Sequence, residues 1–348
     1  MAKLNQGDVI EGIFTIALAL YIAHKKIDKN LLNKIRTKID SKMFANGRVS
    51  YSVAKNLARK LGKKPTDYFN VNFEMRLKPG SVSGAFGEEY DVLYRSSREI
   101  PKISNKIDQL IRSINGANFA RKVDTAITKF LLNNYGEVID FTVIADGIAG
   151  ESSGGNIKGD VTLQIFAKRK NVNKKILSES IPFSIKSESV TVASLSPYKG
   201  MLDIASGLGI KWDAKEKYER LSRPFTGPVE QRAKDRLIRS MYKELQKQIL
   251  SVSTSPKFTQ TAYDFLEKSI FGKDKADVID VTQTKVKEIT LEHFKMLRKN
   301  TSLFPQIRGN NLFFVDKKTK KPIFKIRTKL RVGESKFYVE VAPGIYAK

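Results

Sequence analysis

The sequence predicts an α/β protein in which a small mixed sheet is flanked by helices. Helical periodicity dominates roughly the first 135 residues, and β-type alternation replaces it between residues 137 and 187. The last 40 residues return to a β pattern. The chain has 348 residues, 41% of them hydrophobic, so it can bury a substantial core in two domains or in one domain with large insertions.

The first element is a helix over residues 7–26, with an uncharged run from Gly12 to Ala23. This run is shorter than the roughly 20 apolar residues that span a membrane. Acids at its start and a single preceding lysine argue against a secretory signal. We therefore predict a buried helix of a soluble protein. Its leading carboxylate, Glu11, either lies at the helix N-terminus, where the dipole favours a negative charge, or points into a site.

Helical and extended segments alternate after this helix. Helices are predicted at 28–40, 48–62, around 107–114 and at 117–134, with an extended stretch at 67–77 and a Gly/Ser loop at 79–88. Three strands follow at 137–146, 157–168 and 176–187, with a glycine turn at 150–155. Further helices are predicted from Pro228 to about Leu250, around 258–270 and around 288–299, and a hairpin turn at Asp316–Lys321.

Charge is the largest compositional signal. The chain carries 63 Lys and Arg against 36 Asp and Glu, a formal net charge of +27. Such a field attracts polyanions, so nucleic acid is the expected partner. An anionic membrane surface is less favoured because no lipidation or anchor signal is present. A uniformly lysine-rich host proteome is the alternative explanation.

Residue types that are scarce exclude several kinds of chemistry. The chain has no Cys, which excludes disulfides, thiolate-bound zinc and a cysteine nucleophile. It has two histidines, His24 and His293, and neither lies near a nucleophile motif. A multi-histidine metal site or a serine–histidine triad is therefore disfavoured.

Two predicted strands carry the residues that suit phosphodiester chemistry. Because side chains alternate along a strand, one face is shared by Asp160, Thr162 and Gln164 on the first strand, and by Ser184, Lys186 and Glu188 on the second. An Asp next to a Lys suits metal-assisted hydrolysis. Asp160 would hold Mg²⁺, the backbone carbonyl of Ile185 could be a further oxygen ligand, and Lys186 would steady charge on the phosphate or help to activate water. An ordinary salt bridge between strands is the competing interpretation.

These motifs resemble those of the PD-(D/E)XK nuclease superfamily. The pattern there is an Asp opening one strand and (D/E)xK on the next, and GDVTL at 159–163 followed by FSIK at 183–186 matches it in part. Many members also carry a Glu on the first core helix, to which VIEG at 9–12 corresponds. Gly159 stands where the pattern has Pro, and Ser184 where it has an acid. The resemblance implies that the missing carboxylate comes from elsewhere, with Glu11 as the first candidate and Glu188 as the second.

The resemblance also implies a fold and a domain organisation. We expect a restriction-endonuclease-like mixed central sheet flanked by helices, with a large helical insertion and an α+β C-terminal region. Residues 1–26 and 137–215 would form the nuclease core, 27–136 the mostly helical insertion, and 216–348 a helical and β region that contacts DNA.

A function follows from the same resemblance. It implies a Mg²⁺-dependent DNA endonuclease of restriction-like or homing-like, phage-borne type, with Mn²⁺ able to substitute and Glu11, Asp160 and Lys186 as catalytic residues. The alternatives are a Holliday-junction or other structure-specific nuclease, a catalytically inactive nucleic-acid-binding protein, and a basic structural or packaging protein of a phage. A homodimer would let two sites cut two strands. The expected location is the cytoplasm of a bacterial or phage-infected cell.

Two basic segments are candidate DNA contacts. Residues 317–331, KKTKKPIFKIRTKLR, carry eight positive charges and no negative charge. The apolar residues Phe324, Ile326 and Leu330 alternate there with the cations Lys325, Arg327, Lys329 and Arg331. Cations repeating at about 6.6–6.8 Å suit a phosphate backbone, although a lysine-protected edge strand would look the same. The second segment is the loop with Lys168, Arg169 and Lys170, which would overhang the metal site.

Overall fold

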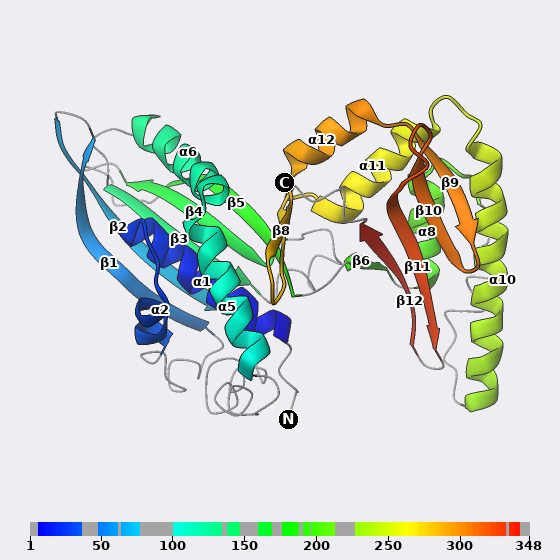
Figure 1. Ribbon diagram of the computed structural model, residues 1–348, viewed down its shortest axis with the longest axis horizontal. Coiled ribbons are helices and arrows are strands. Elements are labelled where there is room, and N and C mark those ends of the chain that lie inside the picture. Colours follow the sequence, from blue (N-terminus) through cyan, green and yellow to red (C-terminus); the bar gives the residue numbers. More distant parts are fainter. Residues whose placement is uncertain are drawn as a thin grey trace. The chain divides into compact units, whose positions relative to one another are not determined.

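The computed structural model divides the chain into two compact units (Figure 1). It describes residues 6–36, 48–61, 64–76, 100–133, 138–146, 159–168, 176–187, 191–195, 197–212, 227–331 and 334–341. Unit 1 comprises Met1–Glu188 with Lys273–Glu288, and unit 2 comprises Ser189–Gly272 with Ile289–Lys348.

Unit 1 is built on a seven-stranded mixed sheet. Its strand order is β1-β2-β3-β4-β5-β7-β8. The strands are β1 (Arg48–Leu61), β2 (Lys64–Arg76), β3 (Val138–Asp146), β4 (Val161–Lys168), β5 (Ile176–Ser187), β7 (Asp277–Val281) and β8 (Val286–Ile289). The pairs β1–β2, β3–β4 and β4–β5 are antiparallel, whereas β2–β3 and β5–β7 are parallel. The predicted α/β class with a mixed central sheet, and the three strands between 137 and 187, are confirmed.

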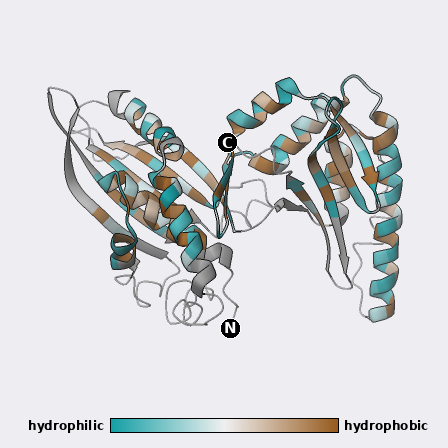
Figure 2. Cartoon of the chain, viewed as in Figure 1, coloured by the Kyte–Doolittle hydropathy of each residue, from teal (hydrophilic) through white to brown (hydrophobic). Residues whose placement is uncertain are grey.

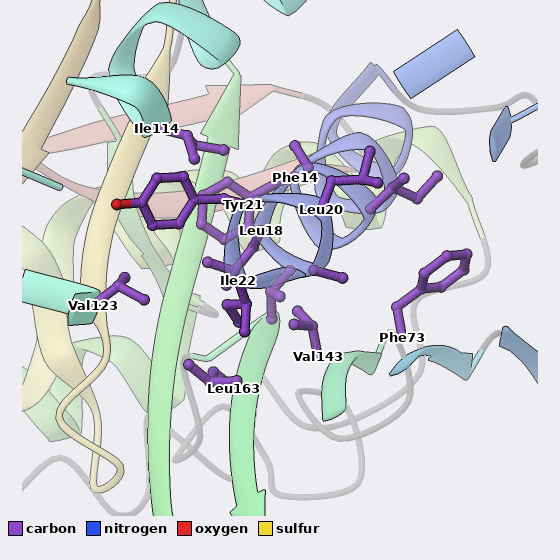
Figure 3. Close-up of a cluster of buried hydrophobic side chains, with 14 of the residues drawn as sticks. Phe14, Leu18, Leu20, Tyr21, Ile22, Phe73, Ile114, Val123, Val143 and Leu163 are labelled. Carbon is purple, nitrogen blue, oxygen red and sulfur yellow. The ribbon is translucent and has the colours of Figure 1, made fainter. Parts of the chain in front are cut away.

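Helix α1 (Gln6–His24) is the central element of the unit 1 core. Its side chains from Ile13 to Ile22 are at most 4% exposed, so the prediction of a buried helix is confirmed. Figure 3 shows these side chains between Phe73, Val143 and Leu163 of the sheet and residues of the helices α5 (Ile100–Asn115) and α6 (Ala117–Asn133). Burying each large apolar side chain contributes about 1.5–3 kcal/mol, which makes α1 a major source of stability.

One predicted helix is wrong. Residues 48–62 were expected to be helical, but 48–61 form β1, a long strand paired with β2. The ring of Tyr51 stacks on that of Phe73 with centroids 5.5 Å apart. Cross-strand packing of this kind outweighs the helix propensity of the Ala, Leu, Lys and Arg residues in the second half of the segment. The expected helix at 28–40 begins as α2 (Lys29–Arg36), and its remainder lies outside the described residues.

The division into units differs from the predicted boundaries in three places. The β1–β2 pair lies in the same sheet as β3–β5, although residues 48–61 and 64–76 were assigned to the helical insertion. Strands β7 and β8 also join that sheet, although they were assigned to the C-terminal region. Strand β6 (Thr191–Leu195) belongs to the other sheet, although it was assigned to the core.

Unit 2 consists of a five-stranded sheet and helices. Its strand order is β6-β12-β11-β10-β9, with β9 (Leu303–Arg308), β10 (Asn311–Asp316), β11 (Pro322–Arg331) and β12 (Glu334–Val341). The helices are α8 (Pro197–Gly207), α10 (Pro228–Val252), α11 (Phe258–Phe271) and α12 (Leu291–Asn300). Figure 2 shows that much of α10 is hydrophilic, as expected for a helix with a solvated face. The helices predicted from Pro228, around 258–270 and around 288–299 are confirmed.

Aromatic contacts attach these helices to one face of the unit 2 sheet. That face, called the helix-covered face, carries Phe314, Phe324 and Phe337, which are all fully buried. Phe314 contacts Phe258 of α11, and Phe324 contacts Tyr263 of the same helix, each with ring centroids 6.4 Å apart. Phe337 contacts Tyr242 of α10 with centroids 4.8 Å apart.

The predicted hairpin turn at Asp316–Lys321 is confirmed. The Asp316 N–H donates to the Lys321 carbonyl over 3.0 Å, and the Asp316 carboxylate accepts from the Thr319 hydroxyl over 2.7 Å. The hydrogen bond from Thr319 is the main cause that lowers the pKa of Asp316. This side chain thus fixes the turn between β10 and β11.

Candidate functional site

Asp160 is the centre of a polar cluster at the start of β4. Its Oδ2 accepts hydrogen bonds from Ser184 Oγ over 3.1 Å, from the Ile185 N–H over 2.9 Å and from Lys186 Nζ over 3.0 Å. The sequence pattern placed Asp160, Ser184 and Lys186 on one face, and the structure brings them together there. We call this the polar face of the unit 1 sheet.

The strand pairing explains how a carboxylate enters the sheet at this point. The β4–β5 ladder ends at Val161 opposite Phe183, so Ile185 lies beyond the last paired residues. The Asp160 side chain takes the place of a strand carbonyl as acceptor for the Ile185 N–H. The N–H and C=O of one residue in an extended strand point to the same neighbour. The Ile185 carbonyl, predicted as an oxygen ligand, is therefore directed to the same edge as Asp160.

The cluster is accessible to a ligand. The side chains of Asp160 and Lys186 are 28% and 26% exposed, while Ser184 is buried. Among the described residues, every hydrogen bond to Asp160 ends on Oδ2. Its Oδ1 therefore remains for a cation, and a carboxylate oxygen is a ligand that Mg²⁺ prefers.

Gly159 has a structural reason to stand where the superfamily pattern has Pro. Its N–H donates to Asp274 Oδ2 over 2.7 Å, a bond that proline could not make. A Cβ atom at this position would lie 2.8 Å from Pro182 Cβ and 2.9 Å from Asp274 Oδ2. The close contact with Pro182 and Asp274 thus fixes the backbone immediately before Asp160.

Replacing Gly159 by alanine is therefore expected to disturb the cluster. Overpacking of this kind costs about 1–3 kcal/mol, and a shift of about 1 Å in Asp160 would reduce any catalysis by roughly a hundredfold. Thermal unfolding and plasmid cleavage would measure the two effects. Gly227→Ala is the control for cleavage, because nothing lies within 4 Å of a Cβ atom there and its position as the N-cap of α10 affects only helix stability. Equal cleavage by the two variants would contradict the role given to Gly159.

Asp280 on β7 is a residue of the polar face that sequence reasoning missed. In the parallel β5–β7 pair, Lys186 lies directly opposite Asp280, so the two side chains leave the sheet on the same side. Asp280 is 1% exposed, and its Oδ2 lies 3.8 Å from Lys287 Nζ on β8. Acid and base thus alternate across the polar face in the order Asp160, Lys186, Asp280 and Lys287. An acid within the buried run DVIDV was the available signal.

Glu11 lies on the helix that covers the other face of the sheet. It is the sixth residue of α1 and therefore beyond the first turn, where the dipole acts on a charge. One turn later, Phe14 packs edge-on against Phe183 of β5 with centroids 5.5 Å apart. Phe183 points to the opposite side from Ser184 and Lys186, because side chains alternate. A contact of Glu11 with Asp160 stays a prediction. Because the two residues lie on opposite faces of the sheet, their side chains would have to meet around the ends of strands β4 and β5.

The predicted DNA contacts have different outcomes. Lys325 and Arg327 point away from the buried Phe324 and Ile326, which confirms the alternation. The face is not exclusively cationic, however, because Glu340 of β12 forms ion pairs with both cations. Glu188, Arg169 and Lys170 lie outside the described residues, as do the side chains of Lys168, Lys329 and Arg331.

Neither a protein-family model nor a curated protein nor a solved structure matches the chain. Across the described residues, no group of three or more His, Cys, Asp or Glu side chains converges in a way that could hold a metal ion. A cation on the polar face would thus be held by one or two carboxylates, which is usual for Mg²⁺. In the same part of the chain, no helix is long and apolar enough to cross a membrane.

Proposed function

We propose that unit 1 is a Mg²⁺-dependent DNA endonuclease of the restriction-endonuclease-like type. The observation that carries the proposal is the contact of Asp160, immediately before β4, with Lys186 on β5 at a point where these strands are no longer paired. The order of elements supports it further, since the buried helix α1 is followed by the antiparallel strands β3, β4 and β5. A surface salt bridge alone would not require Ser184 and the Ile185 N–H to bind the same carboxylate oxygen.

In this proposal the residues of the polar face have distinct roles. Asp160 holds the cation, and the Ile185 carbonyl provides a further oxygen ligand. Asp280 supplies the second carboxylate in place of the acid that Ser184 replaces. Mg²⁺, when bound, would neutralise phosphate charge and lower the pKa of a bound water. Lys186 donates to the phosphate oxygens, on which negative charge develops as water adds to phosphorus and the bond to the leaving oxygen breaks.

The substrate follows from charge and from the resemblance. With a net charge of +27, the chain attracts nucleic acid. The proposal therefore names DNA as the substrate and sequence-specific cleavage of restriction-like or homing-like type as the reaction. It also includes a homodimer, in which each of the two sites cuts one strand. A four-way junction is the alternative substrate.

One observation favours a second candidate, a catalytically inactive nucleic-acid-binding protein. Ser184 is buried and donates to Asp160, so the position of the superfamily acid is occupied by a neutral side chain with a structural bond. If Asp280 does not bind a cation, the polar face would be an ion-pair network and the basic surfaces would bind DNA without cutting it.

The test is a cleavage assay on supercoiled plasmid with Mg²⁺, with Mn²⁺ and with EDTA. We expect nicked or linear products with either metal and none with EDTA. Linear duplex and a four-way junction, tested side by side, would separate sequence-specific from structure-specific cutting. DNA that is bound with either metal but never cut would refute the nuclease and select the inactive protein.

A further inference from the structure

The unit 2 sheet carries aromatic rings and cations on the face opposite its helix-covered face. In the β10–β11 pair, Phe313 lies opposite Lys325, and in the β11–β12 pair, Arg327 lies opposite Tyr338. The Lys325 Nζ is 5.7 Å from the Phe313 centroid, and the Arg327 Cζ is 4.6 Å from the Tyr338 centroid. These are cation–π distances.

The pattern continues onto β9 and the hairpin turn. The Arg308 Cζ lies 5.1 Å from the Phe313 centroid, and the Lys320 Nζ lies 4.8 Å from the Phe304 centroid. Gln306 pairs with Phe313 across the β9–β10 ladder, so these two side chains leave the sheet on the same side. Phe304 lies two residues before Gln306 on β9, and its ring therefore leaves the sheet on that side as well. We call this surface the ring face, defined by Phe304, Phe313, Tyr338 and the cations Arg308, Lys320, Lys325 and Arg327. Its three rings are partly exposed.

One carboxylate organises the middle of the ring face. Glu340 is 8% exposed and lies opposite Lys325 in the β11–β12 ladder. Its Oε2 is 3.3 Å from Lys325 Nζ, and its Oε1 accepts from Arg327 Nε. The cations are thus held in place beside the rings. Among the described side chains, four cations against one carboxylate leave the ring face positive.

This combination suits one class of ligand. Bases stack on exposed aromatic rings and on guanidinium planes, while cations follow the phosphates of the same strand. A duplex keeps its bases paired and presents mainly phosphates to a flat sheet, so the rings would have no partner there. We propose that the ring face binds single-stranded nucleic acid. This inference does not depend on nuclease activity, because binding requires neither Asp160 nor a metal.

The first test removes the rings and keeps their apolar bulk. Phe313→Leu and Tyr338→Leu, measured by fluorescence anisotropy with a labelled oligothymidylate of about 20 nucleotides in EDTA, are each expected to weaken binding roughly tenfold, the loss typical of one stacked base. Affinity for a duplex of equal length should stay unchanged. Wild-type affinity in both variants, or equal losses on single strand and duplex, would overturn the proposal.

The second test is a gain of affinity, which misfolding cannot imitate. Glu340→Gln removes the carboxylate that pairs with Lys325 and Arg327, so both cations become available to phosphates. Single-strand affinity should rise several-fold and its salt dependence should steepen, since each further phosphate contact adds to the slope. Glu230→Gln is the matched control, because it removes the same charge from an exposed position at the start of α10.

Equal gains in Glu340→Gln and Glu230→Gln would show a general charge effect and overturn the ring face as the binding site. A wild-type protein that does not bind the oligonucleotide would also overturn it. Plasmid cleavage is scored separately in Mg²⁺, so either proposal can fail while the other stands.

Discussion

Replacing Lys186 by alanine is expected to reduce plasmid cleavage by at least roughly a hundredfold while leaving DNA binding almost unchanged. Removing one group that stabilises developing charge usually costs a factor of about 10²–10³ in the catalytic rate. Binding should persist because a net charge of +27 falls by only one. Single-turnover cleavage in Mg²⁺ and a filter-binding titration in Ca²⁺ would measure the two effects.

Two further variants sharpen this result. Lys186→Arg keeps the charge but not the ability to take up a proton, so partial activity would favour charge stabilisation and complete loss would favour activation of water. Lys129→Ala removes the same charge from an exposed position on α6 and should cleave like the wild type. If Lys186→Ala also cleaves like the wild type, the proposed active site is wrong.

The sequence predicts those parts of unit 1 whose structure is determined by a residue pattern within one short segment. Strands β4 and β5 follow from alternation of apolar and polar residues, and the contact between Asp160 and Lys186 follows from the pairing of these neighbouring strands. The buried helix α1 follows from its uncharged run in the same way. Strand β1 was missed because its second half consists of good helix formers, and only pairing with β2 makes it extended.

The buried run DVIDV signals an acid within a strand, but no local pattern places Asp280 beside Lys186. A long segment that includes most of unit 2's helices separates the two residues, and β7 then returns to pair in parallel with β5. Parallel pairing needs such a crossover connection, whose length and destination no short pattern specifies. The same reason explains why Glu340 was not expected between Lys325 and Arg327. The sequence shows the cations of β11 as one run, but their acid comes from the neighbouring strand.

Asp280→Asn is expected to abolish most of the cleavage activity and to weaken metal binding. If Asp280 is the second carboxylate of the site, its loss should lower cleavage by roughly a hundredfold, as expected when a group that positions the reaction is lost. The apparent affinity for Mn²⁺ should fall roughly tenfold or more, the range seen when a partner in a metal site is removed. Calorimetric titration with Mn²⁺ measures this second effect without any nuclease activity.

Asp277→Asn provides a control from the same strand. Asp277 is similarly buried, at 8% exposure, but it lies opposite Phe183 and pairs with Lys122 of α6, on the side of the sheet away from Lys186. Each variant removes one carboxylate from β7 and with it one ion-pair partner of a lysine, which is Lys287 for Asp280 and Lys122 for Asp277. Their effects on thermal unfolding should therefore be similar. Only Asp280→Asn should change Mn²⁺ affinity and cleavage. Equal losses in both variants would mean that β7 acts through stability alone, and that Asp280 is a structural partner of Lys287 rather than a ligand.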